Sequence, residues 1–136
     1  MVKQPVPELA LRLLWLSIGY MLVALVIYLS LTSDPVNLDI DIRYQDKFFH
    51  ALAYFTLMFW FAQIYHDRFQ RYGYAISFIL MGVVLEYLQS FNPDRYYEFA
   101  DMLANATGVI LGFLLALTSA KNILFKIDDR LKGAIN

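Results

Sequence analysis

The sequence of 136 residues contains no cysteine, only four prolines and six glycines, and 17% charged residues, below the roughly 25% that is typical of soluble domains. Without cysteine the chain forms no disulfide, has no thiolate nucleophile and attaches no haem through thioethers. The sequence also lacks a serine elbow and a glycine-rich phosphate loop. These absences exclude several common enzyme classes and leave the redox compartment open.

What the sequence has instead is apolar mass: 60% of its residues are hydrophobic and 17% are aromatic. Such a composition indicates an integral membrane protein. Four runs approach the roughly 20 apolar residues that cross a bilayer core. The predicted fold is therefore a single all-α domain of residues 1–136 with four transmembrane helices. We place them at about residues 9–31, 46–66, 72–91 and 101–120, followed by a tail of residues 121–136.

Lys and Arg are distributed unequally between the two sides of such a bundle. The positive-inside rule then places both termini in the cytoplasm, as expected for a multi-pass protein of the bacterial inner membrane. With no soluble domain to carry the basic residues, we expect no nucleic-acid partner. The first apolar run exceeds the h-region of a signal peptide, about 7–15 residues, and is interpreted as an anchor. The inner side would hold Lys3, Arg12, Arg68, Arg71, Lys121, Lys126, Arg130 and Lys132, and the outer side Arg43, Lys47 and Arg95.

The connections between the apolar runs set the order of the helices. The short segments 66–71 and 92–101 favour an up-down bundle. Residues 36–44 alternate apolar and polar, which indicates either an extended segment over the outer mouth or a disordered acidic loop. In the tail 121–136, apolar residues recur at helical spacing among basic ones. This pattern predicts a short helix on the inner membrane surface, with a frayed tail as the alternative.

Three polar clusters interrupt the apolar runs, each spaced to lie on one face of its helix. Ionisable groups are costly inside a membrane, so they usually face the bundle interior and mark a functional site. The predicted topology brings the clusters to the same depth near the outer surface, where they would share a pocket. They comprise Asp46, His50 and Tyr54 on the second helix; Glu86 and Gln89 on the third; and Asp101, Asn105, Gly108 and Gly112 on the fourth.

His50 and Glu86 are the candidate catalytic residues. A histidine beside a carboxylate can act as a general acid or base, and partial burial can bring a glutamate into the useful pKa range. The alternative is a structural ion pair that fixes the bundle. Arg95 and Lys47 are the candidate cations for an anionic ligand, because the guanidinium fork suits both carboxylate and phosphate.

The other polar residues have both a ligand-binding and a structural interpretation. Asp46 and Asp101 orient the catalytic histidine in the first interpretation, and are solvated or capping residues in the second. Asn105 and Gln89 supply hydrogen bonds either to a ligand or between helices. Tyr54 belongs either to the pocket or to the core.

Gly108 and Gly112 form a small-xxx-small pattern, which favours close helix packing over ligand contact. A metal site is not the favoured interpretation, because only one histidine is embedded and no paired-ligand motif accompanies it. We expect no cofactor.

Taken together, these residues resemble a known family. The set Asp46-Lys47-x-x-His50-x-x-x-Tyr54, Glu86-x-x-Gln89, Arg95 and Asp101-x-x-x-Asn105-x-x-Gly108 is similar to the motifs of the VanZ-like membrane proteins and covers residues 46–112. The resemblance implies the family's four-helix membrane layout. The family is named for a role in resistance to the glycopeptide antibiotic teicoplanin, and the resemblance implies this role as a candidate function.

The sequence leaves several functions open. The first hypothesis is an inner-membrane protein whose outer pocket recognises, and in one version modifies, an envelope lipid or lipid-linked precursor. The second is a non-catalytic tolerance or lipid-binding factor for a teicoplanin-type glycopeptide. The third is a scaffold whose polar groups only lock the bundle. A transporter is least favoured, because no discontinuous helix pair is evident. The oligomeric state is not determined by the sequence.

Overall fold

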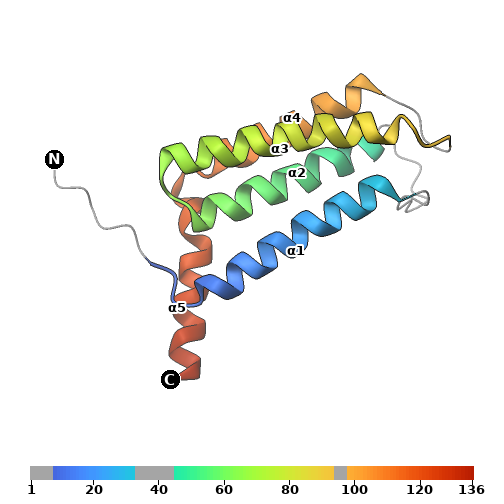
Figure 1. Cartoon of the computed structure of the whole chain (residues 1–136). Coiled ribbons are helices and arrows are strands. Elements are labelled where there is room, and N and C mark those ends of the chain that lie inside the picture. Colours follow the sequence, from blue (N-terminus) through green and yellow to red (C-terminus); the bar gives the residue numbers. More distant parts are fainter. Residues whose placement is uncertain (1–7, 33–44, 94–97) are drawn as a thin grey trace.

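The computed structural model describes residues 8–32, 45–93 and 98–136, and in these ranges the chain is helical with no β-strand. In Figure 1 the long helices lie side by side, consecutive ones run in opposite directions, and the last helix crosses one end of the bundle. The predicted all-α fold is thus confirmed. The helices are α1 (Arg12–Leu31), α2 (Gln45–Ile64), α3 (Arg68–Gln89), α4 (Phe99–Leu115), the 3-10 turn η1 (Ser119–Asn122) and α5 (Ile123–Ile135).

The hydrophobic core is centred on α2. Leu57, Met58, Phe61 and Ala62 have at most 1% of their surface exposed, and residues of the other three long helices pack around them. The outward faces of those helices carry many exposed large apolar side chains. A hydrophobic exterior of this extent is typical of a chain surrounded by lipid.

The tightest helix contact joins α2 and α4. A Cβ atom at Gly108 would collide with the carbonyl oxygen of Ala51, and one at Gly112 would lie 2.8 Å from the carbonyl oxygen of Phe55. Both glycines are therefore placed where only a hydrogen atom fits between two backbones.

Helix α1 approaches α2 closely at Gly19. A Cβ atom at Gly19 would lie 2.9 Å from atoms of both Trp60 and Phe61. The Trp60 indole also donates a 2.9 Å hydrogen bond to the carbonyl oxygen of Trp15. These contacts lie in the first half of α1 and the last half of α2, so the two helices are closest near one end of the bundle.

At that end, which we call the basic end and define by Arg12, Arg68, Arg71 and Lys121, a buried arginine holds three helix carbonyls. The guanidinium of Arg71 donates to the carbonyl oxygens of Tyr65, Ala62 and Ala116, at 2.8, 2.8 and 3.1 Å. Carbonyls at helix C-termini have no partner within the helix. Arg71 thus satisfies the ends of α2 and α4 together.

Helix α5 is attached to the basic end by buried polar groups. The Gln63 side chain donates to the carbonyl oxygen of Ala120 and accepts from the backbone N–H of Leu124. Asp128 accepts from the backbone N–H groups of Ala10 and Leu11. The axis of the segment 119–135 is bent by 80° from that of α4. The tail forms a helix, as its sequence pattern predicted.

Helix boundaries differ from the predicted ones by a few residues. Helix α3 begins at Arg68 rather than 72, because the Asp67 carboxylate accepts from the N–H of Gln70 and caps an additional turn. Helix α4 ends at Leu115 rather than 120. There the carbonyl of Ala116 bonds to Arg71, and Thr118 caps η1 through the N–H of Ala120.

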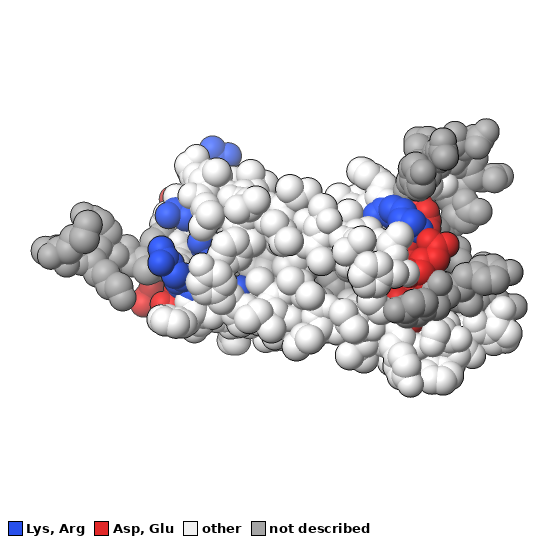
Figure 2. Space-filling view, turned by 90° about the horizontal axis from the view of Figure 1, so that it is seen from above, with Lys and Arg blue, Asp and Glu red and all other residues white. Residues whose placement is uncertain are grey.

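Two of the described helices, α1 and α3, are long and apolar enough to cross a membrane. Helix α4 and the bent segment 119–135 that follows it form a third candidate span if they are counted together. Figure 2 shows a wide surface almost free of charged residues between two charged ends. The predicted segment 36–44 lies outside the described residues.

Candidate functional site

At the opposite end from Arg71, which we call the polar end and define by Asp46, Lys47, Glu98 and Asp101, a lysine is surrounded by carboxylates. The Lys47 ammonium lies 2.7 Å from Asp46 and 2.8 Å from Asp101, and it also bonds to Glu98. The predicted ligand cation is therefore neutralised by the protein itself.

One turn deeper, His50 joins α2 to α4. Its Nδ1 lies 3.0 Å from Oδ1 of Asn105. Because an amide oxygen only accepts, Nδ1 donates, and the lone pair of a neutral imidazole is then on Nε2. Nε2 lies 3.9 Å from a carboxylate oxygen of Asp101. His50 and Asn105 therefore meet, as their helix positions allowed, and Asp101 lies beside the imidazole.

Glu86 is 1% exposed and lies on the inward face of α3. Its Oε1 accepts a 3.0 Å hydrogen bond from the backbone N–H of Glu98. This contact ties the end of α3 to the start of α4. Among the described contacts, Glu86 bonds to Glu98 rather than directly to His50.

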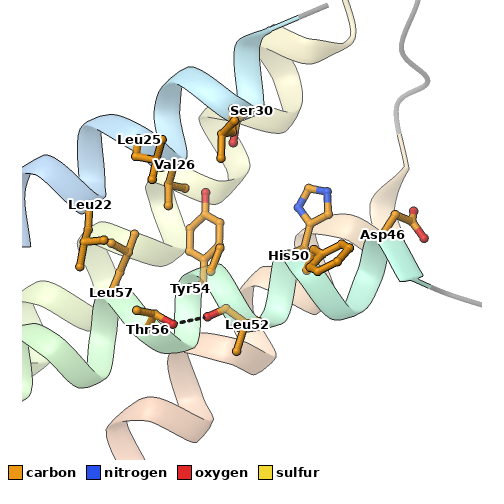
Figure 3. A pocket seen from close by; sticks show the side chains of 13 residues that line it. Leu22, Leu25, Val26, Ser30, Asp46, His50, Leu52, Tyr54, Thr56 and Leu57 are labelled. Atoms are coloured by element: carbon orange, nitrogen blue, oxygen red, sulfur yellow. Dashed lines mark hydrogen bonds between the residues drawn. The ribbon is translucent and has the colours of Figure 1, made fainter. Parts of the chain in front are cut away.

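A cavity of about 420 Å³ lies between the second half of α1 and the first half of α2. Its size is within the range of about 300–1,000 Å³ that holds small ligands. Asp46 and His50 line it near the polar end, and the rest of the lining is mostly apolar (Figure 3). The lining residues are Leu22, Leu25, Val26, Leu29 and Ser30 of α1, and Asp46, Phe49, His50, Leu52, Ala53, Tyr54, Thr56 and Leu57 of α2.

Tyr54 lies at the centre of this cavity wall, with its hydroxyl directed toward α1 (Figure 3). The residue is only 2% exposed, and its hydroxyl has no hydrogen-bond partner among the described residues. The tyrosine ring packs beside Gly82 of α3, where a Cβ atom would lie 3.4 Å from it. A buried hydroxyl without a partner is rare and points to a missing ligand or water.

The sequence-predicted residues thus separate into groups. Asp46, His50 and Tyr54 line the cavity, whereas Glu86 is not among its lining residues. Gln89 donates a 2.5 Å hydrogen bond to the carbonyl oxygen of Ser30 and so connects α3 with α1. Arg95 lies outside the described residues.

Two participants had no sequence signal of their own. Glu98 precedes α4 and contacts both Lys47 and Glu86, but a single glutamate in a connection carries no periodicity. Ser30 lines the cavity at the end of an otherwise apolar run.

The carboxylates around Lys47 also have the spacing of a metal site. One oxygen each from Asp46, Glu98 and Asp101 lie within 4.8 Å of one another, a spacing that a cation can bridge. Lys47 already bonds to all three, so a charge stands where the metal would bind. The donor set does not fit a resident metal beside this lysine.

The fold, the apolar exterior and the polar residues within it define a helical membrane protein. The profile of the VanZ/LLP1 family matches residues 14–124, and the chain belongs to this family. The match takes in every sequence-predicted site residue, from Asp46 to Gly112. Comparisons with curated proteins and with solved structures gave no match.

Proposed function

We propose that this VanZ-family protein recognises an envelope lipid or lipid-linked precursor at its polar end. The observation that carries the proposal is the cavity between α1 and α2, which is apolar along most of its length and polar where His50 and Asp46 enter it. This distribution matches an amphiphile, with hydrocarbon against the leucines and a head group against the polar residues.

The proposal includes four spans and two cytoplasmic termini in the bacterial inner membrane. In support, the two ends of the bundle differ in charge. Arg12, Arg68, Arg71 and Lys121 belong to the basic end, whereas Lys47 is the one basic residue that the structure describes at the polar end. Basic residues favour the cytoplasmic side. The polar end therefore faces outward, where lipid-linked envelope precursors are used.

In the catalytic version of this proposal, His50 acts on the head group. Because Nδ1 donates to Asn105, the Nε2 lone pair can take a proton from a hydroxyl group or a water molecule, and Asp101 stabilises the resulting charge. Glu86 is the acidic partner, held by the N–H of Glu98 and shielded from water.

The test compares lipids from deletion cells that carry wild-type protein, His50→Gln, Glu86→Gln or the control Ser77→Ala. Ser77 is exposed on α3 and its hydroxyl bonds only within its own helix. We expect mass spectrometry to detect an altered head group in the deletion and in both site variants, at unchanged membrane abundance. Wild-type lipid composition in both variants would contradict the catalytic version.

The second candidate is a non-catalytic tolerance or binding factor for a teicoplanin-type glycopeptide. It is favoured by the mutual pairing of the polar groups, since Lys47 is bound by three carboxylates and Glu86 by a backbone N–H. In this case protection rises with the amount of protein, Arg95→Ala weakens it more than His50→Gln, and copurified lipid is unchanged. Turnover of that lipid would reject this candidate.

A further inference from the structure

We propose that the α1–α2 cavity binds one hydrocarbon chain of a lipid whose first oxygen acceptor, an ester carbonyl or a phosphate oxygen, accepts a hydrogen bond from the Tyr54 hydroxyl. This inference rests on the proposed lipid recognition and adds to it the binding mode and the residue that selects the ligand. It identifies Tyr54 as a binding residue for a lipid oxygen.

The position of the cavity follows from how α1 packs. Near the basic end, Gly19 allows α1 to contact Trp60 and Phe61 closely. Beyond that contact the lining begins, from Leu22 to Ser30 on α1. Leu25 and Leu52, one from each helix, are about half exposed, so the cavity reaches the lipid-facing surface. A chain can therefore enter from the membrane without crossing the bundle.

The chemistry of the lining specifies the ligand class. Leu22, Leu25, Val26 and Leu57 offer only hydrocarbon, which suits an acyl or isoprenyl chain. The Tyr54 hydroxyl follows within this apolar lining, and His50 and Asp46 lie closer to the polar end. A ligand that satisfies them has a hydrocarbon tail, then an oxygen acceptor, then a polar head.

The buried hydroxyl is the second, independent observation. A phenol removed from water loses free energy unless it is hydrogen-bonded. Tyr54 is 2% exposed, and its hydroxyl is unpartnered among the described residues. By contrast, the hydroxyl of Thr56, which also lines the cavity, donates to the carbonyl oxygen of Leu52. Tyr54 thus retains a donor for a ligand.

The experiment measures lipid-dependent stabilisation of the full chain in dodecyl maltoside, with undecaprenyl phosphate and phosphatidylglycerol as separate probes. We expect at least one probe to raise the Tm of wild-type protein. In Tyr54→Phe the apparent affinity for that probe should fall about tenfold, the loss of one hydrogen bond to an oxygen acceptor. The responding probe distinguishes an isoprenyl phosphate from a glycerophospholipid.

Two further variants make the result decisive. Tyr20→Phe removes the same atom from a tyrosine outside the cavity, whose hydroxyl lies 3.2 Å from that of Tyr74, and should leave lipid stabilisation unchanged. Ala53→Leu fills the cavity and should abolish the stabilisation. Tyr54→Phe should be at least as stable as wild type without lipid, because no bond within the protein is lost.

The proposal is overturned if neither probe raises the Tm, or if Tyr54→Phe binds the probe as wild type does. The second outcome leaves the proposed function intact, since lipid would still bind and only its partner would be wrong. Unchanged cellular lipids in the His50→Gln and Glu86→Gln strains are a separate result, which would contradict only the catalytic version of the proposed function.

Discussion

The indole N–H of Trp15 donates a 2.7 Å hydrogen bond to the carboxylate of Asp128, which is 1% exposed. This bond connects the start of α1 with α5, 113 positions later in the chain. The same carboxylate accepts from the N–H groups of Ala10 and Leu11, two donors that precede α1. Asp128 therefore holds the start of α1 and the segment before it against α5.

Replacing Asp128 with alanine should lower the free energy of unfolding by about 2–4 kcal/mol, because three donors lose a charged acceptor. The control is Asp129→Ala, which removes an exposed carboxylate from the same helix and should change stability by less than about 0.5 kcal/mol. Chemical denaturation in detergent measures both. Equal effects of the two variants would contradict a stabilising role for the three bonds to Asp128.

The contribution of Asp128 should also depend on pH. Burial alone would raise the pKa of Asp128, but the Trp15, Leu11 and Ala10 donors together with nearby Lys132 lower it below its usual value. A carboxyl group with a depressed folded pKa stabilises the protein above its unfolded pKa of about 3.9, and this contribution is lost as the pH falls through the folded pKa. The stability difference between wild type and Asp128→Asn should be constant near neutral pH and shrink below about pH 4.

Gly108→Ala should destabilise the bundle by about 3 kcal/mol or prevent accumulation in the membrane, because the added methyl group meets the backbone of Ala51. Gly133→Ala is the matched control. A Cβ atom at position 133, in α5, would have no neighbour within 4 Å. Because alanine favours the helix more than glycine does, this variant should be neutral or more stable by up to about 1 kcal/mol. Thermal unfolding of the purified variants should give effects of opposite sign, and a tolerated Gly108→Ala would contradict the close α2–α4 contact.

Lys47→Met should leave the carboxylates of Asp46, Glu98 and Asp101 close together without their shared cation. We expect a loss of about 1–2 kcal/mol at neutral pH, modest because the lysine side chain is 21% exposed and partly screened by water. The loss should diminish on acidification as the carboxylates protonate. A loss that grows at low pH would show that the lysine acts through packing rather than charge.

The absence of native cysteine makes the proposed topology directly measurable. Ser90→Cys and Gly133→Cys each place a single thiol at an exposed position, one near the polar end and one in α5. A membrane-impermeant maleimide should label the first in intact spheroplasts and the second only after lysis. The reverse pattern would invert the proposed orientation.

The sequence was sufficient to predict the helices, because apolar runs of membrane-spanning length define them, and to predict the inward faces of the polar residues, because these follow from helical spacing. The spacing of His50 and Asn105 on their helices anticipated that they would meet, and they lie 3.0 Å apart. The structure also places Glu86 among the buried residues of α3.

What periodicity could not reveal were contacts between distant segments. The hydrogen bond from Trp15 to Asp128 depends on the 80° bend after α4, and no single residue in the sequence predicts that bend. The three carboxylates around Lys47 meet only because two helix N-termini adjoin, so the charge of that lysine was predicted to be free for a ligand. The unpartnered Tyr54 hydroxyl is likewise a property of packing, not of sequence.

The guanidinium of Arg71 fastens the last turns of α2 and α4 to one another, while Gly108 and Gly112 hold the rest of that pair backbone against backbone. Two backbones packed this closely leave no room between them for a ligand. The cavity accordingly lies on the other side of α2, against α1.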